Sequence, residues 1–147
     1  QQDIQLLRNL SSKNITALAR GGGVKPGSGG DPDPVACGAA LAAFLIGTED
    51  SATDQSFFSC AVDFSSSPGK GWMTLLSDPV YSYPLGSPTG PAKTDPASGL
   101  VKRGFSGGAV AWVNESAATM GCVKWNSSVV SGTCPPGVPS TSTSLSL

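Results

Sequence analysis

The sequence predicts an α+β fold: a short N-terminal helix–strand–helix segment, an antiparallel, β-rich, sandwich-like half, and a tail of Pro, Ser and Thr. Two observations support this prediction. Before residue 56, apolar residues recur at helical spacing or form short continuous runs. From residue 56 onward, short strand-like runs alternate with Pro, Gly and Ser, as is typical of antiparallel sheets. We therefore divide the 147 residues into 1–55, 56–134 and 135–147.

The first two elements are a helix and a strand. Residues 4–11 are predicted to be helical, because Asp3 is a suitable N-cap and three apolar residues share one face. Residues 14–20, which read NITALAR, are predicted to form a buried strand. The Gly- and Pro-rich residues 21–33 then form a loop.

The second predicted helix has clear start and stop signals. Asp33 is its N-cap, Pro34 occupies the first turn, and Gly47 suits its end. The body, residues 35–46, is apolar nearly all the way round, so the helix is expected to be buried on most sides. Its 12 apolar residues are fewer than the roughly 20 that a membrane span needs. We therefore expect no membrane span.

Short strands follow, and a low-complexity tail ends the chain. The predicted strands are residues 57–64, 73–76, 101–105, 109–113, 120–125 and 129–133, the last two forming a hairpin. The Pro/Ser/Thr composition of residues 135–147 is typical of a stalk that carries O-linked sugar.

Charge and composition exclude several functions. The chain has 9 Lys and Arg against 10 Asp and Glu, a net charge near −1, which argues against nucleic acid as a partner. It contains no His, which excludes Ser-His-Asp triads, Cys-His dyads and His-ligated metals. The sequence contains no C-x-x-C pair, so a zinc site is not supported, and we predict no metal and no cofactor. Paired carboxylates are the chemistry still available, and no pair stands out.

All four asparagines begin an N-x-Ser/Thr sequon. With 32 Ser and Thr among 147 residues, random placement gives this result with a chance of roughly 0.002. We therefore predict a secreted glycoprotein with its sugars on exposed asparagines. The predicted glycosylation sites are Asn9, Asn14, Asn114 and Asn126.

The four cysteines indicate the same extracellular compartment. An even number in a secretory context predicts disulfides, for which three connectivities exist. Of these we prefer the two sequence-local pairs, Cys37 with Cys60 and Cys122 with Cys134.

Two further motifs have a functional and a structural interpretation. Residues 104–108 match G-x-S-x-G, but with no His in the chain a turn between two strands explains the glycines better. The aromatic residues Trp72, Tyr81 and Trp112 are candidates for stacking on sugar rings. Packing in the core or at an edge is the more frequent role of such residues in small β domains.

Several stretches resemble the C-terminal part of glycoside hydrolases in which a TIM barrel precedes a β-sandwich. Residues 14–22 and 40–47 are similar to the last barrel strand and helix. Residues 78–81, 85–92 and 103–114 are similar to the beginning of the sandwich. The resemblance implies a barrel-derived architecture. It assigns no catalytic residue, because the catalytic carboxylates of such enzymes lie on earlier barrel strands, outside this sequence.

Three functions are compatible with these observations. The first is a structural or self-assembling extracellular glycoprotein without its own active site, which we prefer. The others are a carbohydrate-binding accessory module and the C-terminal piece of a glycoside hydrolase. Self-assembly is expected because a strand at 14–20 that is buried on both faces needs neighbours, and open edges attract other chains. We expect a homo-oligomer or filament, with the tail at 135–147 held by a neighbouring subunit.

Overall fold

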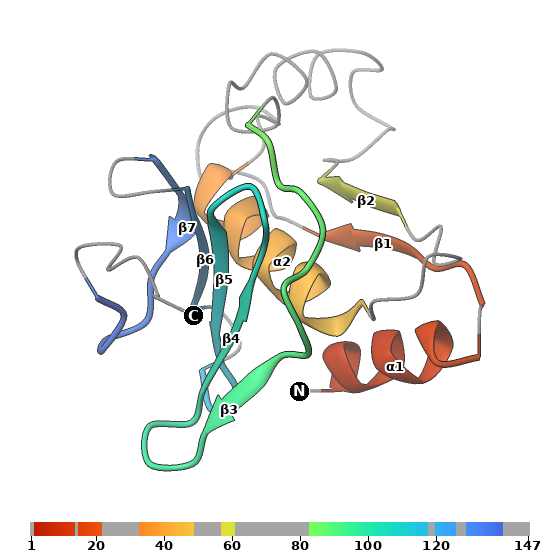
Figure 1. Cartoon of the computed structure of the whole chain (residues 1–147), viewed down its shortest axis with the longest axis horizontal. Coiled ribbons are helices and arrows are strands. Elements are labelled where there is room, and N and C mark those ends of the chain that lie inside the picture. Colours follow the sequence, from red (N-terminus) through yellow and green to blue (C-terminus); the bar gives the residue numbers. More distant parts are fainter. Residues whose placement is uncertain are drawn as a thin grey trace.

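A computed structural model gives the fold, which is α+β as predicted (Figure 1). The structure describes residues 2–13, 15–21, 33–48, 57–60, 83–117, 120–125 and 129–139. Its elements are α1 (Gln2–Ser11), β1 (Leu18–Gly21), α2 (Pro34–Gly47), β2 (Phe57–Cys60), β3 (Lys93–Asp95), β4 (Leu100–Gly104), β5 (Ala109–Asn114), β6 (Gly121–Trp125) and β7 (Val129–Thr133). The strand predicted at 73–76 and most of the loop predicted at 21–33 lie outside the described residues.

Helix α2 begins and ends at the residues that the sequence indicates. The Asp33 carboxylate accepts a hydrogen bond from the backbone N–H of Val35 at 2.9 Å and so caps the first turn. Pro34 needs no hydrogen-bond partner there, because it has no N–H. After Gly47 the chain becomes extended at Thr48, whose N–H donates to the carbonyl of Phe44 at 3.0 Å.

The strands β1 and β2 form a parallel pair joined by α2, with Leu18 opposite Phe57 and Gly21 opposite Cys60. Residues 57–60 are predicted above to belong to the antiparallel half, and for this strand the prediction is wrong. The chain leaves β1, crosses through α2 and returns to the same edge, so both strands run in the same direction. A disulfide between Cys37 and Cys60 fixes α2 to the end of β2.

The other five strands form one antiparallel sheet in the order β3-β4-β5-β6-β7. Each strand pairs antiparallel with its neighbour in sequence, as predicted for this half of the chain. Strand β3 is not predicted from the sequence, because its three residues are polar; in the structure all three are exposed.

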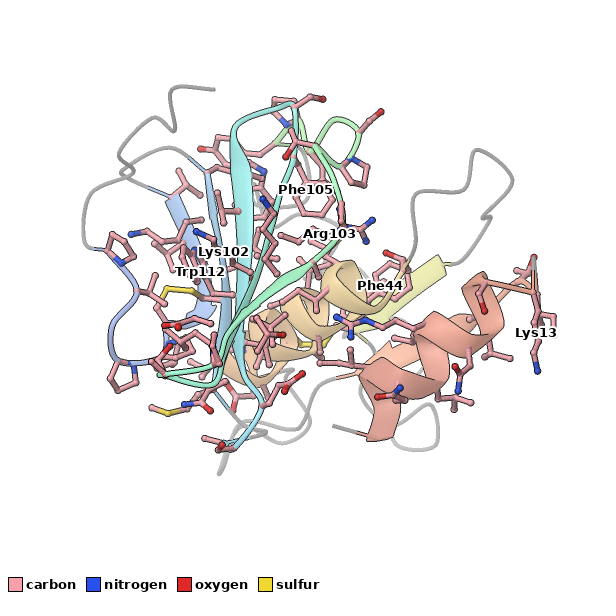
Figure 2. All side chains as sticks on the ribbon, turned by 60° about the horizontal axis from the view of Figure 1, so that its bottom comes forward. Lys13, Phe44, Lys102, Arg103, Phe105 and Trp112 are labelled. Atoms are coloured by element: carbon pink, nitrogen blue, oxygen red, sulfur yellow. A yellow bond between two sulfur atoms is a disulfide. The ribbon has the colours of Figure 1, made fainter. Side chains whose placement is uncertain are left out.

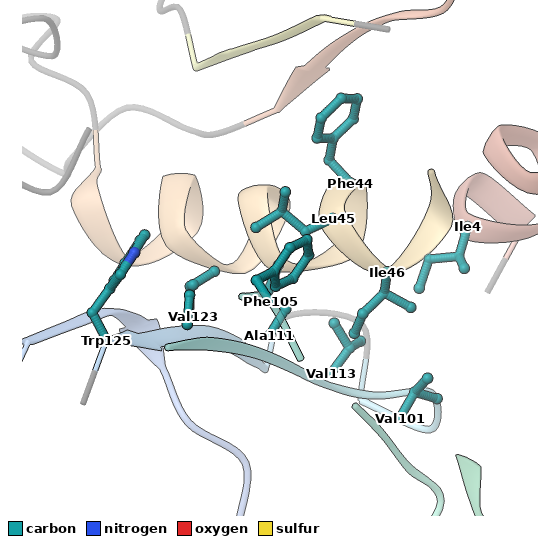
Figure 3. Packing of buried hydrophobic residues seen from close by; sticks show 12 residues of the cluster. Ile4, Phe44, Leu45, Ile46, Val101, Phe105, Ala111, Val113, Val123 and Trp125 are labelled. Atoms are coloured by element: carbon teal, nitrogen blue, oxygen red, sulfur yellow. The ribbon is translucent and has the colours of Figure 1, made fainter. Parts of the chain in front are cut away.

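Helix α2 lies between the two sheets, which explains why nearly every side of it is apolar (Figure 3). Below it in Figure 3, Ile46 packs toward Val101 and Val113 of the five-stranded sheet. Above it, Phe44 meets Phe58 of β2 with ring centroids 5.6 Å apart. The layers are therefore sheet, helix and sheet, and the segments before and after residue 56 share one core.

Two glycines set the close approach of α2 to β7. A Cβ atom placed on Gly38 would lie 2.1 Å from the backbone nitrogen of Gly132, so the two backbones are in direct contact. Gly132 has φ +87°, a conformation that residues with a side chain rarely adopt. Any side chain at position 38 would therefore push the helix away from the sheet.

Arg103 closes the other end of α2. Its side chain is buried, and its Nη1 donates to the carbonyls of Leu45, at 3.0 Å, and Thr48. Its Nε donates to the carbonyl of Gly90 at 3.3 Å. A cation is favourable at the C-terminus of a helix, where unpaired carbonyls gather.

Candidate functional site

The five-stranded sheet has one face that does not pack on α2, which we call the outer face. Its side chains alternate with core residues along β4, β5 and β6. They are Leu100, Lys102, Val110, Trp112, Asn114, Cys122 and Lys124. Figure 2 shows Lys102 and Trp112 on this side, with Phe105 and Phe44 on the other.

Trp112 is the aromatic residue of the outer face. Its side chain is half-buried, and the ammonium nitrogen of Lys102 lies over its ring, 5.5 Å from the centroid. The two residues are direct cross-strand neighbours on β4 and β5. Of the three predicted sugar-stacking residues only Trp112 is described, because Trp72 and Tyr81 lie outside the described residues.

The chain after β7 runs back over the outer face. Cys134 is bonded to Cys122 of β6, and Pro135 is buried. The ammonium group of Lys124 donates to the carbonyl of Pro139 at 2.5 Å. Residues 135–139, predicted as the start of a tail held by another subunit, therefore pack on their own sheet; residues 140–147 are outside the described residues.

Two of the four sequon asparagines are described. Asn9 lies in the last turn of α1 and is exposed. Asn114 ends β5 on the outer face and is half-buried. Asn14 and Asn126 lie outside the described residues.

Asn114 enters the β5–β6 connection through a side-chain turn. Its side-chain Oδ1 accepts a hydrogen bond from the N–H of Ser116 at 2.8 Å, and its backbone carbonyl accepts one from the N–H of Ala117 at 3.2 Å. Asn side chains stabilise turns in this way. The turn holds the first and third residues of the sequon, Asn114 and Ser116, in one compact arrangement. The sequon is evident from the sequence, whereas this geometry is evident only from the structure.

Both disulfides have the sequence-local connectivity, Cys37 with Cys60 and Cys122 with Cys134. The Cα atoms of the two pairs are 5.6 Å and 4.8 Å apart, within the range of disulfides. All four cysteines are thus used, and none is free. Two disulfides in a chain of this size indicate an oxidising, extracellular environment.

The described aspartates near turns have structural roles. Asp33 caps α2, as described above. Asp95 begins the turn between β3 and β4, where its carboxylate accepts hydrogen bonds from the Ser98 hydroxyl at 2.5 Å and the Ala97 N–H at 3.1 Å. These contacts, that of Ser98 first, lower the pKa of Asp95 below its ordinary value. The described residues contain no group of three or more Cys, Asp or Glu placed to hold a metal ion.

The G-x-S-x-G segment at 104–108 is the turn between β4 and β5. Phe105 and Ala109 close it, with the Phe105 N–H donating to the Ala109 carbonyl at 2.9 Å. The hydroxyl of Ser106 accepts a hydrogen bond from the N–H of Ser87 at 2.9 Å and so fixes the preceding segment. The turn interpretation is confirmed.

Comparison with protein-family models, curated proteins and solved structures finds no match for this chain. Among the described residues, no helix combines the length and apolar character needed to cross a membrane.

Proposed function

We propose that this chain is a secreted, N-glycosylated, structural glycoprotein module without its own active site. The observation that carries the proposal is the pair of disulfides, because disulfides persist in oxidising compartments, and sequons are glycosylated in one of these. The exposure of Asn9 and the turn at Asn114 support two of the modification sites. The roles of Asp33 as a helix cap and of Asp95 in a turn are consistent with a structural rather than a catalytic protein.

Self-association is the finer part of this proposal. Within the described residues, β1 and β2 pair only with each other, and a parallel sheet of two strands is unusually small. A strand from a second copy, added to this pair, is the contact that we propose for a homo-oligomer or filament.

The resemblance to the end of a barrel glycoside hydrolase gives the second candidate function. The unit β1–α2–β2 favours it, because barrels of that kind are built from parallel β-α-β units. In that case the β1–β2 edge receives strands of a barrel, and this chain is the C-terminal module of the enzyme.

One expression experiment tests the main proposal. The full chain is secreted from eukaryotic cells and its intact mass is measured before and after enzymatic removal of N-glycans. We expect a mass above the 14.7 kDa of the polypeptide and sugar on at least two sequons. An intact mass equal to that of the bare polypeptide contradicts the proposal.

Sedimentation and an activity assay separate the finer alternatives. Sedimentation velocity at micromolar concentration is expected to show species larger than one glycosylated chain. A single monomeric species rules out self-association. Polysaccharide hydrolysis is expected to stay at background, and turnover that is abolished by replacing one Asp or Glu would demonstrate an enzyme instead.

A further inference from the structure

Trp112 and Asn114 lie two residues apart on β5 and share the outer face of the sheet. Side chains at this spacing in a strand are about 6.6 Å apart and point the same way. An indole ring therefore stands next to the asparagine of a sequon. Trp112 is thus a candidate for stacking on sugar, and Asn114, beside it, is a candidate for carrying sugar.

The side chain of Asn114 is held in a defined orientation. Its Oδ1 is engaged by the N–H of Ser116 at 2.8 Å, which fixes the plane of the amide. Among the described residues, nothing accepts a hydrogen bond from its Nδ2. That nitrogen, the atom to which an N-linked sugar is attached, thus has no competing acceptor within the part of the chain that the structure describes.

The strand position of Trp112 is also fixed. Trp112 pairs with Lys102 on one side and with Cys122 on the other, and Cys122 is bonded to Cys134. The ammonium group of Lys102 over the ring shows that a group on the surface reaches the electron-rich face of the indole. Lys102 is itself half-buried, and its flexible side chain leaves the ring at small cost.

We propose that Asn114 carries an N-linked glycan whose first N-acetylglucosamine packs on the Trp112 ring. This inference rests on the proposed function, because it requires that the chain is N-glycosylated. The C–H groups of a pyranose ring carry partial positive charge and are attracted to the negative face of an indole. Since the plane of the Asn114 amide and the strand position of Trp112 are fixed before the sugar arrives, little conformational entropy is lost on contact.

The attachment uses a lipid-linked oligosaccharyl diphosphate as donor. A bond forms between Nδ2 of Asn114 and C1 of the first sugar, and the bond between C1 and the diphosphate oxygen breaks. The proton lost from Nδ2 leaves with the diphosphate. The stacked sugar is then a covalent extension of the outer face, and it shields Trp112 from water.

The test is a double-mutant cycle on secreted full-length chain. Asn9, Asn14 and Asn126 are replaced by Gln, so that Asn114 carries the single glycan, which is trimmed enzymatically to one N-acetylglucosamine. Melting temperatures are compared with Ser116→Ala, which abolishes the sequon but keeps Asn114 and the backbone N–H that its Oδ1 accepts from, in chains with Trp112 and with Trp112→Thr. With Trp112 present, the sugar is expected to raise Tm by about 2–4 °C, as a contact of aromatic-pair strength does in a domain of this size.

In the Trp112→Thr chain the sugar is expected to change Tm by less than about 1 °C, and in a Trp112→Phe chain by an intermediate amount. Because each comparison is made within one background, a loss of stability caused by the Trp112 substitution itself cancels. A chain that keeps only the Asn9 sequon is the matched control, and its sugar is expected to act independently of Trp112. In NMR spectra, the N-acetyl methyl protons on Asn114 are expected to give cross-relaxation with indole protons of Trp112.

Equal shifts with and without Trp112 overturn the inference while leaving the proposed glycoprotein intact. An unmodified Asn114 in a chain that carries sugar at other sequons overturns it as well. Absence of glycan from all four sequons overturns both the inference and the proposed function.

Discussion

Gly38 of α2 and Gly132 of β7 are in backbone contact, and a Cβ on Gly38 would lie 2.1 Å from the Gly132 nitrogen. This contact joins the helix to the last strand of the five-stranded sheet. The helix therefore reaches the sheet at a distance that no other residue at position 38 permits.

The first prediction concerns this contact. Gly38→Ala is expected to lower the free energy of unfolding by about 1–3 kcal/mol or more, the cost of overpacking a well-packed interior. The clash involves backbone atoms of Ser131 and Gly132, so no side chain can turn aside to relieve it. Guanidinium denaturation measures the change. Val35→Ala, on the exposed part of the same helix, is the control and is expected to change stability by less than about 0.5 kcal/mol.

The second prediction concerns the buried guanidinium at the end of α2. Arg103→Leu is expected to cost about 2 kcal/mol or more, because the carbonyls of Leu45 and Thr48 lose their donor. Arg103→Lys is expected to recover only part of the loss, since one ammonium group lacks the planar fork of donors. Thermal denaturation checks both variants. The comparison residue is the adjacent Lys102, whose replacement by Met should cost about 1 kcal/mol or less. Equal effects at positions 102 and 103 would contradict the assigned role.

The third prediction concerns the disulfides. Replacing both cysteines of either pair by Ser is expected to lower stability by about 3 kcal/mol, because each bond closes a loop in the unfolded chain. The loops span 23 residues for Cys37–Cys60 and 12 for Cys122–Cys134, so the two losses should be similar in size. Non-reducing peptide mapping checks the connectivity. Thiols that react in the denatured, unreduced protein would show that the pairs are incomplete.

The fourth prediction concerns Asp95 in the β3–β4 turn. Hydrogen bonds from Ser98 and Ala97 favour its ionised form, so its pKa in the folded protein lies below its ordinary value. The turn is therefore stabilised above the ordinary Asp pKa, and this contribution is lost as pH falls through the lower, folded-state pKa. A carboxyl-carbon NMR titration is expected to show a lower midpoint for Asp95 than for the same residue in a short peptide. Ser98→Ala should raise the midpoint, and an unchanged midpoint in that variant would exclude Ser98 as the main cause.

The features that follow from local chemistry could be predicted from the sequence. Asp33, Pro34 and Gly47 define α2 because capping and helix termination depend on residues within one turn. Strands β4, β5, β6 and β7 could be predicted to within about one residue because their apolar runs are separated by turn residues. The disulfide pairing followed from short separations along the chain.

The features that depend on distant parts of the chain could not be predicted. The direction of β2 relative to β1 depends on where the chain emerges after α2. The residues at 57–60 themselves do not distinguish a parallel from an antiparallel strand. The three residues of β3 are polar, and their pairing with β4 sets them in a strand. Arg103 was not singled out, because only the fold brings it to the end of α2. Trp112 and Asn114 are two residues apart in the sequence. This spacing places them on one face only if both lie on the same strand, which the structure shows.

The placement of the two disulfides determines how the chain responds to mechanical tension. A force applied to the two ends of the chain cannot extend the segments between the bonded cysteines. The Cys37–Cys60 disulfide keeps about 80 Å of contour length from extending, and the Cys122–Cys134 disulfide about 40 Å. The first loop contains most of α2, and the second contains β7. Stretching can therefore peel β3, β4 and β5 apart, but the β6–β7 hairpin and the α2–β2 crossover stay connected until a sulfur–sulfur bond is reduced. Under mechanical load the chain outside the two disulfide loops can thus be extended, whereas the loops themselves extend only after their disulfides are reduced.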